Sequence, residues 1–114
     1  MMKVSELSGF ALDWAVATVF NPSDEWGEWK PSANWSQAGP IIEQERIDIR
    51  WSGQQWIASL WPDNSGMIKN PAQRYKHNTE QGGPTPLIAA MRCYVTSKLG
   101  EEITVPEAYL ETSN

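Results

Sequence analysis

The chain has 114 residues and a formal net charge of −5, with 40% hydrophobic and 20% charged residues. These values are typical of one folded globular domain and exclude a disordered chain. The acidic balance argues against general binding to nucleic acid or to an anionic membrane surface. The single cysteine, Cys93, excludes an intrachain disulfide and a multi-cysteine zinc site.

The first residues lack the continuous apolar run of a signal peptide, because Ser5, Glu6 and Asp13 interrupt it. No stretch has the apolar length of a transmembrane helix, so we expect no membrane partner. Residues 8–19 have apolar side chains at helical spacing, with Ser8 as N-cap, and Asn21-Pro22 ends this predicted helix. Asp13 is expected on its wetter side as a solvated residue, and the alternative is a carboxylate at the edge of a ligand site.

The segment from Pro22 to Pro40 contains Pro, Ser, Asn, Gly and Trp without any period, which predicts a loop over about residues 21–40. Trp26, Trp29 and Trp35 lie in this loop. Two interpretations stay open for these indoles: they cap the core, which is slightly favoured, or they stack on a ligand. Residues 37–46 then predict a short turn or helical turn that opens at Pro40.

An antiparallel hairpin is expected next, with strands at residues 47–51 and 54–61 joined at Ser52-Gly53. Residues 62–81 are polar and rich in Pro, Gly and Asn, which predicts a second loop. That loop is either solvated or a lid in which Arg74 and His77 bring positive charge to an anionic ligand. His77 has no second ligand at metal-binding spacing, so no metal site is predicted.

The stretch from Thr85 to Gly100 predicts a complete helix with both ends specified. Thr85 is a suitable N-cap, Pro86 fits the first helical position, and Gly100 fits the left-handed C-terminal position. One apolar face is predicted for this helix, formed by Leu87, Ile88, Met91, Val95 and Leu99. Residues 103–105 predict a third strand, and residues 107–114 predict a polar tail. The expected fold is α+β: a single domain over residues 1–114, with two main helices on a small antiparallel sheet made by the hairpin and the C-terminal strand.

Three blocks of this chain resemble a known family. They are Lys3-Val4-Ser5-Glu6-Leu7-Ser8-Gly9 continued by Leu12-Asp13-Trp14-Ala15-Val16-Ala17, then residues 34–43 (NWSQAGPIIE), then residues 83–92 (GPTPLIAAMR). Their order and content are similar to the NinX-like small proteins encoded by temperate phages of enteric bacteria. That family has no assigned biochemical role, so the resemblance implies a phage setting, in the cytoplasm of the infected host, and no catalytic residues.

No enzyme is expected, because the sequence has no nucleophile elbow, Walker loop, dinucleotide fingerprint or metal-ligand cluster, and no cofactor is expected. Cys93 lies inside the main helix and is interpreted as a buried small hydrophobe. A carboxylate pair such as Asp13 with Glu43, in a small phage enzyme acting on a nucleotide, stays open as an alternative.

The preferred function is non-catalytic binding of a small anionic, nucleotide-type ligand that counters host defence. Gly82 and Gly83 let the backbone approach a ligand closely, and the helix N-terminus after Thr85 presents free N–H groups. Arg92 supplies a positive charge, and the tryptophan side chains stack on a nucleobase. The predicted binding residues are Trp26, Trp29, Trp35, Gly39, Gly82, Gly83, Thr85 and Arg92. Arg92 as a structural residue is an equal alternative. A module that inhibits a host protein is the second function, and the number of tryptophans favours a homo-oligomer.

Overall fold

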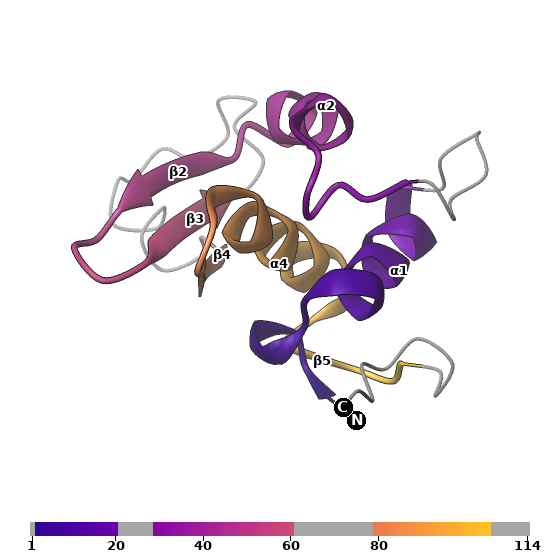
Figure 1. Ribbon diagram of the computed structural model, residues 1–114. Coiled ribbons are helices and arrows are strands. Elements are labelled where there is room, and N and C mark those ends of the chain that lie inside the picture. The colour runs from indigo at the N-terminus through magenta and orange to yellow at the C-terminus, as the bar shows by residue number, and fades with distance from the viewer. Residues whose placement is uncertain (1, 21–28, 61–78, 106–114) are drawn as a thin grey trace, which may run out of the picture.

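The computed structural model describes residues 2–20, 29–60 and 79–105 (Figure 1). Its helices are the short 3-10 helix η1 (Val4–Glu6), α1 (Gly9–Phe20), α2 (Trp35–Glu45) and α4 (Pro86–Leu99). Its strands are β1 (Met2–Lys3), β2 (Asp48–Trp51), β3 (Trp56–Leu60), β4 (Thr79–Gly83) and β5 (Glu102–Ile103). The α+β class predicted from the sequence is confirmed. Among the described residues, no helix is long and apolar enough to cross a membrane.

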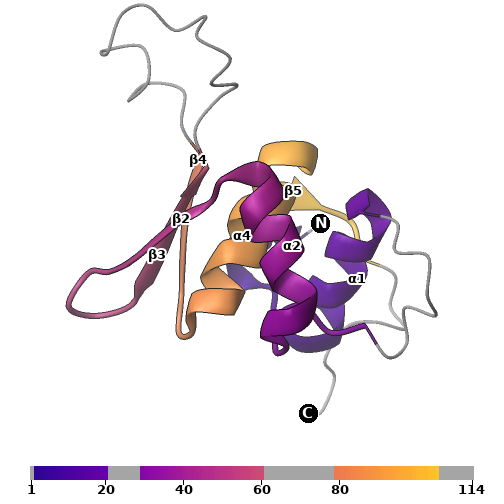
Figure 2. The same cartoon turned by 90° about the horizontal axis from the view of Figure 1, so that it is seen from above.

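Helix α4 occupies the centre of the fold. Figure 2 shows the three-stranded sheet on one side of α4 and helices α1 and α2 on the other, and α4 contacts all of these elements. The helix begins and ends as predicted. Thr85 Oγ1 accepts a hydrogen bond from the Ile88 N–H at 3.1 Å, Pro86 is the first helical residue, and Gly100 takes a φ of 97° at the C-cap.

The prediction of one apolar face on α4 is confirmed only in part: Leu87, Met91 and Val95 are buried and Ile88 packs against the core, but burial is not confined to that face. Seven of its residues are buried, and they lie all round the helix: Leu87, Ala89, Ala90, Met91, Cys93, Tyr94 and Val95. Leu99, which the spacing assigned to the buried face, has 45% of its surface exposed. A helix with packed elements on several sides buries small residues wherever a neighbour approaches closely, and helical spacing alone does not show this.

The hairpin prediction is confirmed, with β2 and β3 antiparallel and Trp51 paired with Trp56 next to the turn. Gly53 has a φ of 102°, a backbone conformation that favours glycine, and the Ser52 N–H donates to the Gln55 carbonyl at 2.9 Å. The two indoles lie with ring centroids 5.2 Å apart and an interplanar angle of 59°. Such a cross-strand aromatic pair stabilises the hairpin next to its turn.

The third strand of this sheet is β4, and the prediction of residues 103–105 for that place was wrong. The sheet order is β2-β3-β4, with Gly83 opposite Trp56 and Thr79 opposite Leu60. Strand β5 pairs instead with β1, with Met2 opposite Ile103. The last three residues of the loop predicted over residues 62–81 are therefore part of β4, and residues 62–78 lie outside the described structure. Residues 79–83 (TEQGG) have no apolar alternation and two glycines, so sequence propensity gave no strand signal.

Gly83 explains why a glycine-rich strand occupies this place. A Cβ added at Gly83 would lie 2.9 Å from the Ala89 backbone nitrogen and 3.1 Å from Ile88 Cγ2. The missing side chain therefore lets β4 lie directly against the first turns of α4.

Gly83→Ala is expected to destabilise the protein by about 1–3 kcal/mol, because the added methyl overpacks against helix backbone that cannot yield. The matched control is Gly39→Ala in α2, where a Cβ meets nothing within 4 Å. At that partly buried helical position, which has open space for a methyl group, alanine is expected to stabilise by about 0.5–1 kcal/mol. Urea unfolding of both variants measures the change in the free energy of unfolding, which should fall for Gly83→Ala and rise for Gly39→Ala. Equal effects would contradict the proposed contact.

Helix α2 corrects the prediction of a loop to Pro40 followed by a short turn. The helix runs from Trp35 to Glu45 with Pro40 inside it. Asn34 caps it by accepting from the Ser36 N–H at 2.9 Å, and Arg46 ends it in the left-handed conformation. A proline in a helix interior is unfavourable by about 3 kcal/mol. Complete burial of Ala38 and Ile41 against the core offsets this penalty.

Candidate functional site

The residues predicted to bind a ligand do not form one cluster in the described structure. Trp26, Arg74 and His77 lie outside the described residues. Trp29 is buried and stacks on Phe20 with ring centroids 5.5 Å apart, so it caps the core. Trp35 is the first residue of α2 and has 58% of its surface exposed. Gly39 lies in the middle of the same helix, with open space at its Cα.

Arg92 and Gly82 contact each other within the fold. The guanidinium donates from Nη1 to the Gly82 carbonyl and from Nε to the Leu7 carbonyl, both at 2.8 Å. Desolvation by burial lowers the pKa of Arg92, although an arginine remains protonated at neutral pH. Arg92 therefore joins the edge strand β4 to the segment after η1, which is the structural role that the sequence left open.

Gly82, Gly83 and Thr85 likewise make contacts within the chain. A Cβ at Gly82 would lie 2.6 Å from Gln55 Nε2, so Gly82 makes room for that side chain. Gly83 makes room for α4, and the Thr85 hydroxyl caps the same helix. The described contacts join these residues to neighbouring elements and join neither Trp29 nor Trp35 to Arg92.

Asp13 differs most from its preferred prediction. It was expected as a solvated helix residue, but only 3% of its surface is exposed. Its Oδ1 accepts from the Ser32 N–H at 2.9 Å, which ties α1 to the chain that leads into α2. Burial raises the pKa of Asp13, while the hydrogen bonds from Ser32 and the charge of Lys30 partly oppose this effect.

A hollow of about 200 Å³ opens beside Asp13, between the first turns of α1 and the segment that precedes α2. We name it the α1 hollow; it is lined by Gly9, Phe10, Asp13, Lys30, Ser32 and Ala33. Two hydrogen bonds hold its outer wall: the Lys30 N–H donates to Gln37 Oε1 at 2.6 Å, and the Ala33 N–H donates to the Lys30 carbonyl at 2.9 Å. In Figure 1 this wall is the purple segment that crosses from the side of α1 to α2.

The side chains of the α1 hollow combine three chemical functions. Phe10 has 54% of its surface exposed and presents an aromatic ring, and Lys30 Nζ lies 5.9 Å from the centre of that ring. The Asp13 carboxylate supplies a buried acceptor. An aromatic face, a cation and a hydrogen-bond acceptor are the groups that orient a planar polar ligand bearing negative charge. The sequence signal for this site was Asp13, the one acidic residue in an otherwise apolar helix. Phe10, Lys30 and Ser32 gave no signal of their own.

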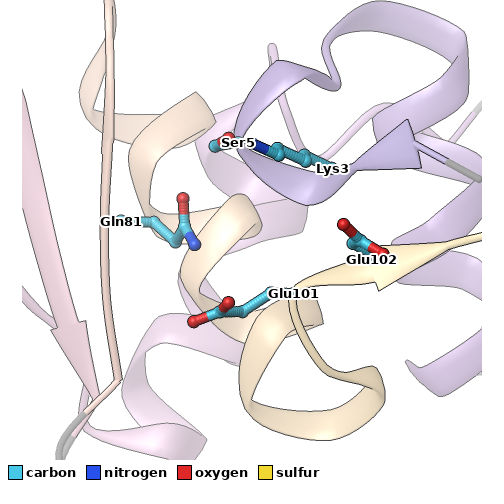
Figure 3. A pocket seen from close by; sticks show the side chains of 5 residues that line it. All are labelled: Lys3, Ser5, Gln81, Glu101 and Glu102. Carbon is cyan, nitrogen blue, oxygen red and sulfur yellow. The ribbon is translucent and has the colours of Figure 1, made fainter.

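A second hollow of about 290 Å³ lies where the N-terminal segment, β4 and the turn after α4 meet (Figure 3). We name it the β4–β5 hollow; it is lined by Lys3, Ser5, Gln81, Glu101 and Glu102. Figure 3 shows the Gln81 amide extending from β4 into the same space as the Glu101 carboxylate. Two carboxylates and one ammonium give this hollow a negative balance, so it is less suited to an anionic ligand than the α1 hollow.

Cys93 has no surface exposure and lies near the Thr79 carbonyl, with Sγ 3.3 Å from its oxygen. Burial, with a smaller contribution from Glu80, raises the pKa of this thiol to about 12. A protonated, inaccessible thiol is a poor nucleophile. In the part of the chain that the structure describes, no group of three or more His, Cys, Asp or Glu side chains could hold a metal ion.

Comparison with known protein families identifies the family of this chain. Residues 3–98 match the family described as Bacteriophage P22, NinX. The chain belongs to the NinX family. The match covers α1, the α1 hollow, the sheet and nearly all of α4. This NinX-family chain is therefore a phage accessory protein. No curated protein matches it.

Proposed function

We propose that this phage accessory protein binds a small anionic, nucleotide-type ligand in the α1 hollow, without turning it over. Sequestration of such a ligand would deprive a host defence pathway of its signal in the cytoplasm of the infected bacterium. The observation that carries the proposal is the placement of an exposed Phe10 ring, the Lys30 ammonium and the Asp13 carboxylate around one hollow.

The three groups have separate roles in this proposal. A nucleobase stacks on Phe10, a contact worth about 1–3 kcal/mol per base. The Asp13 carboxylate accepts hydrogen bonds from the polar edge of the base, and Lys30 moves from the ring to a phosphate at the rim. The hollow, at about 200 Å³, is smaller than the roughly 300–1,000 Å³ of sites for drug-sized ligands. It therefore suits one ring system, with the rest of the ligand outside.

Binding without chemistry fits the groups that surround the hollow. The Asp13 carboxylate is bonded to Ser32 and lies beside Lys30, and the buried thiol of Cys93 is not among the lining residues. Trp35 lies two residues beyond Ala33 with an exposed indole, so it remains a candidate for a second stacking surface.

The test is a thermal-shift screen against mononucleotides, cyclic dinucleotides and ADP-ribose derivatives, followed by calorimetric titration of each compound that raises the unfolding temperature. A ligand at 100 times its dissociation constant stabilises by about 2.7 kcal/mol. Phe10→Ala is expected to raise the dissociation constant by about tenfold or more, because the stacking contact is lost. Lys30→Ala should weaken binding more at low salt than at high salt, because screening already reduces its charge effect.

The control is Leu99→Ala, which removes another exposed apolar side chain, one that does not line the α1 hollow. Its affinity for the ligand should equal that of the unmodified protein. A panel in which no compound shifts the unfolding temperature contradicts the proposal. An equal loss of affinity in Phe10→Ala and Leu99→Ala would also contradict it.

A second candidate function is inhibition of a host protein. The observation that favours it is the exposure of two tryptophans, Trp35 and Trp51, at 58% and 56% of their surfaces. Tryptophan is enriched among the residues that dominate binding energy at protein interfaces. This function predicts no response to nucleotides and a stoichiometric complex with a single host protein, which Trp35→Ala would weaken.

A further inference from the structure

Strand β2 forms an open edge of the three-stranded sheet. The order β2-β3-β4 places β2 at one side, and among residues 2–20, 29–60 and 79–105 no strand pairs with its outer edge. Asp48, Arg50 and Trp51 are exposed on it, and Ile49 is partly buried. An exposed strand edge presents unpaired N–H and C=O groups, which are a template for pairing with another strand.

The hairpin turn determines which backbone groups point outward. The Ser52 N–H donates to the Gln55 carbonyl, so these two residues form the hydrogen-bonded pair that closes the turn. Hydrogen-bonded and non-hydrogen-bonded pairs alternate along an antiparallel ladder. Trp51 and Ile49 therefore direct their N–H and C=O groups away from β3, toward the open edge, while Asp48 and Arg50 bond to β3.

We propose that two copies of this chain pair along β2, antiparallel, about a two-fold axis at Ile49. In this register Asp48 lies directly opposite the partner's Arg50, and the symmetry repeats the pair. A symmetric register centred on Asp48 or on Arg50 would instead place two like charges directly opposite each other, which is destabilising. The charge sequence of β2 is thus self-complementary in one register and repulsive in the two neighbouring ones.

The other side chains of β2 are compatible with this pairing. The guanidinium of Arg50 already donates to Ser59 Oγ at 3.0 Å and to Glu80 at 2.6 Å, and its five N–H groups leave donors for a second carboxylate. Trp51 lies on the same sheet face as Ile49. Ile47, which faces Trp51 across the proposed ladder, is buried and its N–H donates to the Ile42 carbonyl at 3.0 Å, so it offers only its carbonyl to the pairing.

The test is the oligomeric state of the full chain, measured by sedimentation velocity from low to high micromolar concentration. The unmodified protein should form dimers. Asp48→Lys places a cation opposite the partner's Arg50 twice and should raise the dimer dissociation constant by about tenfold or more. The matched control is Glu43→Lys, the same charge change at an exposed position of α2.

Ile49→Pro removes one outward N–H without removing a ladder bond to β3, and proline is tolerated on edge strands. It should give a monomer with the far-UV circular dichroism of the unmodified protein. If Ile49→Pro fails to fold, Asp48→Lys still decides the question. An unmodified protein that stays monomeric overturns the proposal. A dimer that Asp48→Lys leaves unchanged, or that Glu43→Lys weakens equally, also overturns it.

Discussion

Met91→Ala is expected to lower the free energy of unfolding by about 2–5 kcal/mol, the range measured when large apolar side chains are truncated in protein cores. Met91 has no surface exposure and lies in α4, between the sheet and the other two long helices. Alanine is a good helix former, so the loss reports lost packing rather than lost helix propensity. Thermal unfolding followed by circular dichroism measures the effect.

Leu99→Ala is the control for this prediction. The spacing of apolar residues assigned Leu99 and Met91 to the same face of the helix, but the structure leaves 45% of Leu99 exposed. Its truncation should change the stability by about 0.5 kcal/mol or less. Comparable losses of stability in Met91→Ala and Leu99→Ala would contradict the structure, in which Met91 is buried and Leu99 is partly exposed.

Arg92→Met should destabilise the protein by about 2–4 kcal/mol, because two backbone carbonyls each lose a charged donor. These are the carbonyls of Leu7 and Gly82, which accept from Nε and Nη1 respectively. Methionine keeps most of the apolar stem, so the change isolates the hydrogen bonds. Amide hydrogen exchange should become faster in β4 and in the segment after η1, before the interior of α4 is affected.

Two comparisons make the Arg92 prediction specific. Arg92→Lys keeps the charge but offers a single ammonium in place of the planar fork, so it should recover about half of the loss at most. Arg50→Met removes an exposed ion pair with Glu80 and should destabilise by about 1 kcal/mol or less. Equal losses in Arg92→Met and Arg50→Met would contradict the role of Arg92 as a connection between elements.

The sequence pointed to the α1 hollow only through Asp13, and only as the less favoured of two alternatives for that residue. An acidic residue in the apolar run of α1 raised two alternatives, and the structure places the carboxylate at the wall of a hollow. Phe10 lies one turn before Asp13 on α1, and Lys30 and Ser32 reach that wall because the Ser32 N–H bonds to Asp13. That contact joins residues 19 positions apart in the chain, so no local pattern reveals it. Arg92 and Gly82 were predicted to bind a ligand, but in the structure the Arg92 guanidinium donates to the Gly82 carbonyl.

The sequence by itself determined the helix ends and the hairpin turn, because these depend only on residues that are neighbours in the chain. Thr85, Pro86 and Gly100 specify the ends of α4, and Ser52-Gly53 specifies the hairpin turn, because caps and turns depend on the φ, ψ and side-chain hydrogen bonds of a few adjacent residues. Only the tertiary structure decided that residues 79–83 form a strand, that α2 continues through Pro40, and that Asp13 is buried. In each case a distant partner outweighs a weak or contrary local preference. Strand β4 forms because it pairs with β3 and packs on α4, and α2 continues because Ala38 and Ile41 are buried in the core. Asp13 is buried because its carboxylate accepts a hydrogen bond from Ser32.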